Sequence, residues 1–277
     1  MSFKDTFINM VPGPTREQFL YDEIVKRGPP KNLVPVTVNG PSNIKITYQV
    51  MPDYLMVDGT RVTLTPATAQ RVADAFGMKL PTSKMSKQIY DAADTKVRAT
   101  PLSSSGYVGS NGQRYSGKDV VQHRISQSDA AVEYSKLTDA EIAKLNKNKS
   151  PGIISGHGKE IVQPLGDPKD VSFGGWQGQN GKALQPYTAA HKGAAQSHSE
   201  YGLYTRLISN NVQVTTPGGK VINTTMDKLA SKPNLWKSIS DADKALSYNS
   251  KPELDVPPQT DKSVIKKIDD FINNIKL

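Results

Sequence analysis

The first hundred residues alternate between stretches with helical spacing and stretches with β-strand spacing of apolar positions. Phe19, Leu20 and Ile24 recur at helical spacing, which predicts a helix over residues 15–27. Stretches rich in β-branched residues follow, and Asp58-Gly59 between two apolar runs is typical of a hairpin turn. The predicted strands cover residues 33–38, 43–50 and 54–64. We expect a small antiparallel sheet in this part of the chain.

Two helices are predicted after this sheet. Thr65 can cap a helix that has Pro66 at its first position, where a missing backbone N–H costs nothing. A second helix begins at Thr82 or Ser83 and carries its apolar residues on one side. Residues 65–93 are therefore expected to form a helical hairpin.

The second half of the chain changes from helical to β-rich. Residues 122–145 have helical periodicity in two pieces, and the capping box Thr138-Asp139-Ala140-Glu141 opens the second piece. Short strands and a hairpin around Pro217-Gly218-Gly219 follow. The predicted strands are 152–155, 160–163, 170–173, 201–208, 212–216 and 220–225, and the predicted helices are 225–231, 238–247 and an amphipathic one from Val264 to Ile275.

These patterns divide the chain into three parts. Residues 1–97 hold the first helix, the sheet and the helical hairpin, and residues 119–277 form an α+β half with the candidate site and the C-terminal helix. Between them, the Gly/Ser-rich stretch 98–118 is either a linker or a functional loop whose Tyr107 and Tyr115 cover a cleft. The expected fold class is α+β, with small antiparallel sheets and packed helices in one mixed globular unit.

Composition removes several kinds of chemistry. The chain of 277 residues has no cysteine, which excludes disulfides, thiolate zinc sites and a cysteine nucleophile. No export signal is recognisable, and no window approaches the roughly 18 apolar residues of a membrane span. We expect a soluble protein without membrane insertion, cytoplasmic in the producing cell or associated with a virion.

The net charge of +9 has two interpretations. It either serves solubility alone or favours an acidic polymer or an envelope glycan as partner. The lysines are spread along the chain without interleaved aromatic residues or a nucleic-acid-binding motif, so nucleic acid is not an expected partner. Self-assembly or contact with virion proteins is the further expectation for partners.

Candidate chemistry begins with the segment Ser-Gly-His-Gly-Lys-Glu at residues 155–160. No Walker loop, dinucleotide fingerprint, HExxH, GxSxG or EF-hand loop is present, so the common enzyme classes have no support. His157 and Glu160 place an imidazole and a carboxylate together after a strand, as general acid–base catalysis requires. The alternative is a tight strand–turn–strand connection that needs a glycine on either side of His157.

A second group of polar residues surrounds His191. Trp176 and Gln185 lie within fifteen positions of it and have the composition of a carbohydrate- or peptide-binding wall, although Trp176 could equally belong to the core. Two histidines with Glu160, Asp167 or Asp170 could also bind zinc or manganese. Spacing does not require such a site, so the sequence leaves open whether a metal or cofactor binds.

Several segments in a fixed order resemble an uncharacterised family of bacterial and bacteriophage proteins. These segments are PDYL (52–55), TPATAQRVADAFG (65–77), LPTSKM (80–85), GHGKEIV (156–162), ALQPYTAAH (183–191) and YGLYTRLI (201–208), with His123 and Glu133 between them. The resemblance implies a shared fold and site but no reaction. Relatives often have Tyr-Ser-His-Gly-x-Arg-Leu where this chain has Tyr201 to Leu207, so this block lacks the serine and histidine that a Ser/His mechanism would use.

The leading hypothesis is a hydrolase-like or substrate-binding protein that acts on peptidoglycan or another glycan of the bacterial envelope and is phage-encoded. The proposed catalytic residues are His157, His191 and Glu160, and the proposed substrate-binding residues are Lys84, Trp176, Gln185, Tyr201 and Arg206. The alternative is a non-catalytic virion structural or interaction protein. An enzyme should place these groups around one pocket, whereas a structural protein should bury or scatter them.

Overall fold

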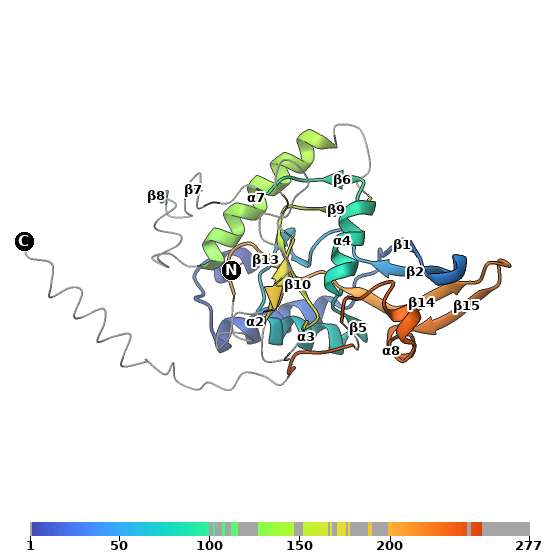
Figure 1. Ribbon diagram of the computed structural model, residues 1–277. Coiled ribbons are helices and arrows are strands. Elements are labelled where there is room, and N and C mark those ends of the chain that lie inside the picture. The colour runs from blue at the N-terminus through green and yellow to red at the C-terminus, as the bar shows by residue number, and fades with distance from the viewer. Residues whose placement is uncertain are drawn as a thin grey trace, which may run out of the picture.

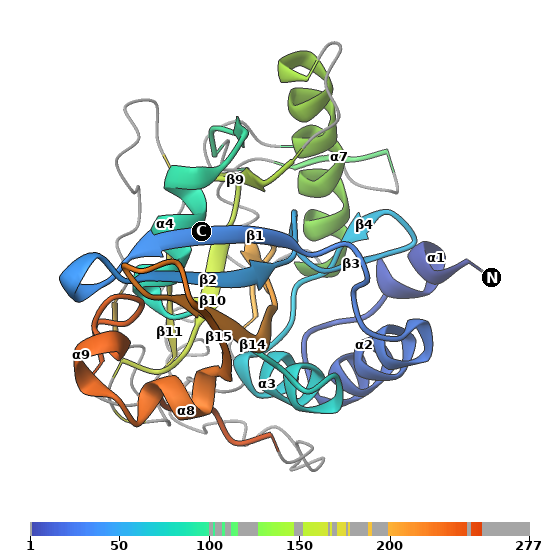
Figure 2. The same ribbon diagram turned by 90° about the vertical axis from the view of Figure 1, so that its right-hand side faces the viewer.

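The computed structural model gives the fold shown in Figures 1 and 2. It describes residues 2–99, 102, 107–108, 112–115, 127–146, 152–165, 167, 171–175, 177, 188–189, 199–242 and 245–250. Mixed helices and small, mainly antiparallel sheets form one chain, which confirms the predicted α+β class.

Four helices precede residue 100, and their boundaries follow capping chemistry. The short helix α1 (Phe3–Phe7) starts at a capping box, and α2 (Pro14–Arg27) ends before a glycine with positive φ. The side chains of Thr65 and Thr82 accept backbone N–H groups at the starts of α3 (Pro66–Ala75) and α4 (Ser83–Ala92). The predictions for α2, α3 and α4 are confirmed.

The main sheet combines strands from both ends of the sequence. Its strands β1 (Val34–Asn39) and β2 (Lys45–Val50) pair with each other around the 3-10 turn Pro41–Asn43, and β14 (Ile208–Thr215) pairs with β2 and with β15 (Val221–Thr225). The order is β1-β2-β14-β15, and the short β5 (Met78–Lys79) pairs with the start of β14. This sheet therefore joins the first hundred residues to the C-terminal half.

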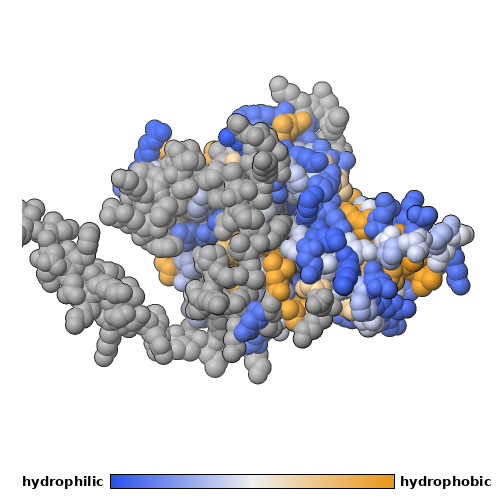
Figure 3. Space-filling view, viewed as in Figure 1, coloured by the Kyte–Doolittle hydropathy of each residue, from blue (hydrophilic) through white to orange (hydrophobic). Residues whose placement is uncertain are grey.

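One face of the main sheet carries the apolar residues. Alternation points Ile46, Tyr48, Val212 and Val214 into a buried cluster, where Trp236 joins them. Residues of α4, α8 (Met226–Ala230) and α9 (Pro233–Trp236) cover that face. The far end of the sheet projects from the body as an arm, at the right of Figure 1, and its atoms are mostly hydrophilic in Figure 3.

A second sheet lies in the body of the molecule. Its strands are β12 (Thr188–Ala189), β11 (Ser172–Gly174), β10 (Lys159–Val162) and β13 (Leu203–Tyr204), in that order. Three strand pairs accompany it: β3 (Met56–Val57) with β4 (Thr60–Arg61), β6 (Thr95–Lys96) with β9 (Ile154–Ser155), and β7 (Tyr107–Val108) with β8 (Arg114–Tyr115). The β3–β4 hairpin confirms the turn predicted at Asp58-Gly59.

Three predicted elements are corrected. The helix α7 (Gln127–Leu145) runs through Thr138 without a break, because the Thr138 hydroxyl donates to the Tyr134 carbonyl inside the helix and caps nothing. Residues 238–242 and 245–250 contain no helix, whereas α9 forms just before them. The predicted strand over 201–208 is reduced to β13, and β14 begins at its last residue.

Some predictions concern residues outside the described ranges. The C-terminal amphipathic helix and most of the Gly/Ser-rich stretch 98–118 belong to this group. Within the part of the chain that the structure does describe, no helix has the length and apolar character needed to cross a membrane.

Candidate functional site

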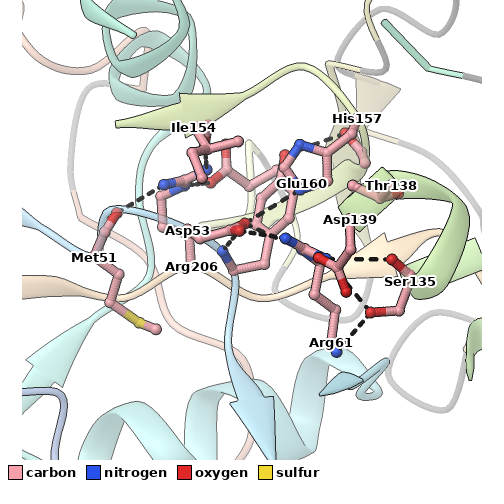
Figure 4. A network of polar contacts seen from close by, with 12 residues as sticks. Met51, Asp53, Arg61, Ser135, Thr138, Asp139, Ile154, His157, Glu160 and Arg206 are labelled. Carbon is pink, nitrogen blue, oxygen red and sulfur yellow. Dashed lines mark hydrogen bonds and ion pairs between the residues drawn. The ribbon is translucent and has the colours of Figure 1, made fainter. Parts of the chain in front are cut away.

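Three of the predicted site residues meet in one buried cluster, shown in Figure 4. Glu160 lies on β10, His157 lies in the turn between β9 and β10, and Arg206 follows β13. All three are at most 1% exposed. β10 and β13 are parallel neighbours in which Glu160 pairs with Tyr204, so Arg206 lies two positions beyond the partner of Glu160.

Arg206 uses every edge of its guanidinium within the protein. Its Nε donates to Oε1 of Glu160 at 2.9 Å, and its two terminal nitrogens donate to the carbonyls of Met51 and Ile154, both at 2.7 Å. The Ser86 hydroxyl, from α4, donates to the other oxygen of Glu160. This planar fork ties β10 to the ends of β2 and β9.

A second ion pair lies beside the first. Nη2 of Arg61 is 2.5 Å from Oδ2 of Asp53, and its Nη1 is 2.6 Å from Oδ1 of Asp139, which is half-exposed on α7. Nε2 of His157 lies 3.2 Å from Oδ1 of Asp53. The two arginines and two of the three carboxylates are buried, and Asp139 forms the rim of the cluster.

Burial and charge pairing shift the pKa values of two groups in this cluster. Burial lowers the pKa of His157 more than the Asp53 carboxylate raises it, so the ring is neutral at pH 7. Burial alone would raise the pKa of Asp53, but the contact with the His157 ring and the ion pair with Arg61 outweigh it and hold that pKa well below its usual range. The cluster therefore holds matched, fixed charges around a neutral imidazole.

Aromatic rings enclose the same cluster. The rings of Tyr54 and Tyr204 stack with centroids 5.1 Å apart, and Tyr54 meets the His157 ring edge-on at 4.6 Å. The guanidinium of Arg206 lies 4.6 Å from the centroid of Tyr54. Tyr134 donates its hydroxyl to the His157 carbonyl at 2.5 Å. These rings are themselves buried and cover the cluster.

The glycines around His157 are explained by packing. Gly156 has φ +103°, and a Cβ there would lie 2.5 Å from the Val97 carbonyl. A Cβ on Gly158 would overlap the rings of Tyr204 and Tyr54. The segment Ser-Gly-His-Gly-Lys-Glu thus forms the tight strand–turn–strand connection that was the structural alternative for this motif.

The other predicted site residues lie apart from this cluster or outside the described residues. Lys84 donates from Nζ to the Lys237 carbonyl at 2.6 Å, just after α9. Tyr201 is buried and packs its ring against Tyr134 with centroids 5.6 Å apart. His191, Trp176 and Gln185 lie outside the described residues. The structure thus brings His157, Glu160 and Arg206 together. Tyr201 is connected to them through the stacked rings of Tyr134 and Tyr204.

Sequence reasoning missed half of the cluster. Asp53, Tyr54 and Arg61 come from a segment that predicts only strands and a hairpin, and Tyr204 was part of a predicted strand. A similar arginine was missed at Arg16, which is 1% exposed and donates to Glu17, Ser128, Ser199 and Thr63. The one sequence feature that could have pointed to Asp53 and Tyr54 was PDYL at 52–55, which is part of the resemblance to the bacterial and bacteriophage family.

An open groove lies elsewhere, on the main sheet. It has a volume of about 460 Å³ and is lined by Thr47, Gln49, Asn211, Val212, Gln213, Asn223, Thr224, Thr225 and Lys228. These residues come from β2, β14, β15 and the start of α8. No residue of the buried arginine cluster belongs to its lining.

Metal ligands do not gather in the part of the chain that is described. Among those residues, no group of three or more histidine, aspartate and glutamate side chains could hold a metal ion. Glu160 is occupied by Arg206 and Ser86. Comparison of the chain with protein-family models, with curated proteins and with solved structures finds no match.

Proposed function

We propose that this chain is a non-catalytic binding protein for a bacterial envelope polymer, acting as a virion or interaction protein. The observation that carries the proposal is the burial of His157, Glu160 and Arg206 in a cluster whose charges are matched internally. A general acid or base must come within hydrogen-bond reach of the atom that it protonates or deprotonates. Side chains that are at most 1% exposed and packed under tyrosine rings favour support of the fold over catalysis.

Two features of the sequence support an envelope polymer as target. The ordered segments that resemble bacterial and bacteriophage proteins indicate this biological setting, and the net charge of +9 favours approach to anionic cell surfaces. Long-range attraction of this kind raises association rates without fixing specificity. A separate contact surface is therefore part of the proposal.

The hydrolase hypothesis keeps one observation in its favour. Asp53 and His157 lie 3.2 Å apart, which is the separation of a carboxylate that orients a catalytic imidazole. In that hypothesis His191 and the residues near it would complete the site. The two functions differ in whether the polymer is cleaved or only bound.

Co-sedimentation with purified peptidoglycan sacculi separates the two functions. We expect the protein to sediment with the sacculi and to release no soluble fragments above the buffer control. The His191→Ala and His157→Gln variants should sediment like the wild type if they fold, as checked by circular dichroism. Fragment release by the wild type that His191→Ala abolishes would establish the hydrolase and contradict the proposal, and absence of sedimentation would contradict it as well.

A further inference from the structure

The outer face of the main sheet carries uncharged polar side chains across its middle, and Lys45 and Val221 stand in the adjoining row. One row across all four strands consists of Thr37, Thr47, Gln213 and Asn223, which are partners in the strand register. The hydroxyls of Thr37 and Thr47 are 2.8 Å apart. Strand alternation places Gln49, Asn211 and Thr225 on the same face, opposite the buried Ile46, Tyr48 and Val212.

The groove described above occupies this face. Its lining contains four side-chain amides, from Gln49, Asn211, Gln213 and Asn223, and none of them hydrogen-bonds to another of the described residues. The lining has no carboxylate and no aromatic ring, and its one charged group is Lys228. The nearby Asp227 is held by Lys79 at 2.8 Å and by Asn210 at 3.1 Å. The groove therefore presents free donors and acceptors with little charge.

The backbone under the groove is irregular at one point and otherwise firmly anchored. The register between β14 and β2 shifts between Ile208 and Val212, so that β14 bulges where Asn211 enters the groove. Bulges often re-aim a side chain at a functional edge of a sheet. On the opposite face, Tyr48 and Val212 are at most 1% exposed. The amides are thus carried by a sheet whose position is fixed by packing.

The chemistry of the lining discriminates among occupants. An apolar helix or peptide would leave the amides unpaired, which costs free energy. A nucleic acid or other polyanion would need a cluster of cations and, for single strands, stacking aromatics, but Lys228 stands alone among the lining residues. A sugar hydroxyl both donates and accepts, as do the amide and hydroxyl groups here, and an acetamido group matches a side-chain amide in the same way.

We propose that this groove binds a neutral, N-acetylated glycan chain, with Gln49, Gln213 and Asn223 as its principal hydrogen-bonding residues. The inference deepens the proposed function, on which it rests, by naming the site and the class of sugar. The volume of about 460 Å³ lies within the range of roughly 300–1,000 Å³ typical of small-molecule sites. Because no ring stacks on the sugar, a single groove binds weakly, with a dissociation constant on the order of 1 mM. Binding to a polymer gains from many copies of the protein.

NMR titration with an N-acetylglucosamine tetrasaccharide tests the site directly. Side-chain amide signals of Gln49, Gln213 and Asn223 should shift in the wild type, and Gln213→Ala or Asn223→Ala should weaken binding about five- to tenfold. Asn39→Ala is the matched control, because Asn39 is an exposed amide on β1 outside the groove lining. This control should bind like the wild type.

Three results of the titration would overturn the proposed site. No shift up to about 10 mM sugar, shifts confined to other surfaces, or a response only to a sulfated polysaccharide would each exclude a neutral-glycan groove. If sacculi still sediment with the protein in those cases, the proposed function stands and this site alone is wrong. If the tetrasaccharide binds in the groove but sacculi do not sediment with the protein, the site stands and the envelope target is wrong.

Discussion

The guanidinium of Arg206 donates from Nε to Oε1 of Glu160 at 2.9 Å while both residues are at most 1% exposed. A buried charge is stable only when it is paired and when its remaining donors find acceptors. Here the carbonyls of Met51 and Ile154 take the other two edges of the guanidinium. Arg206, which the sequence suggested as a substrate-binding cation, therefore connects three segments of the chain inside the protein.

Arg206→Lys should destabilise the protein by about 2–4 kcal/mol, because one ammonium group cannot reach a carboxylate and two carbonyls in three directions. Urea unfolding measures the change. The matched control is Arg27→Lys, since Arg27 pairs with Glu23 and Asp58 at the surface and should change stability by less than about 0.5 kcal/mol. Equal effects of the two substitutions would contradict the role assigned to Arg206.

Gly158→Ala should destabilise the protein by about 1–3 kcal/mol, because its Cβ would overlap the rings of Tyr204 and Tyr54. Gly218→Ala provides the control, because a Cβ at Gly218 meets nothing within 4 Å and no positive φ is present there. Thermal unfolding of the two variants gives the comparison. A neutral Gly158→Ala would mean that the turn around His157 is loosely packed.

Loss of the hydroxyl should lower the stability of the protein at one tyrosine of the cluster and leave it unchanged or raise it at another. The Tyr134 hydroxyl donates to the His157 carbonyl at 2.5 Å, so Tyr134→Phe should cost about 1–2 kcal/mol. The buried Tyr204 hydroxyl has no hydrogen-bond partner among the described residues, so Tyr204→Phe should be neutral or stabilising by up to about 1 kcal/mol. Urea unfolding that ranks the two variants the other way would refute this assignment.

The free energy of unfolding should decrease as the pH drops below the pKa of an unperturbed histidine. Burial lowers the pKa of folded His157, whereas in the unfolded chain it is about 6.5. Below about pH 6.5 the unfolded chain takes up a proton that the folded protein does not, so the contribution is present above that pH and is lost below it. Between about pH 7.5 and 5.5, His157→Gln should lose about 1 kcal/mol less stability than the wild type. Equal losses in chemical unfolding at the two pH values would show that His157 is not buried in its neutral form.

Local patterns predicted much of the fold. Capping residues such as Thr65 and the turn at Asp58-Gly59 act over a few residues, so the sequence was enough to predict α3 and the β3–β4 hairpin. The same local reasoning failed at Thr138, where tertiary packing continues α7 through a capping-box pattern. It also could not show that β2 pairs with β14, about 160 residues later.

The site was harder to predict because burial is a property of the whole fold. His157, Glu160 and Arg206 were among the eight residues expected around one pocket, and the structure places these three in one buried cluster. A Gly-His-Gly turn has the same sequence whether its imidazole faces a cleft or a tyrosine ring. Asp53 and Arg61 carried no motif, since their partners lie far away in sequence. The polar groove went unnoticed for a related reason. Exposed glutamine and asparagine on strands are indistinguishable from ordinary surface until the register aligns them.

A histidine NMR titration shows whether the cluster around His157 is a closed structural core. The ring signal of His157 can be assigned by its loss in His157→Gln. In a closed core, this signal should keep the chemical shift of the neutral ring from about pH 8 to about pH 6 and should not respond to peptidoglycan fragments. A His157 signal that titrates near pH 6.5 and shifts on addition of those fragments would show instead that His157 is an accessible group, as catalysis requires.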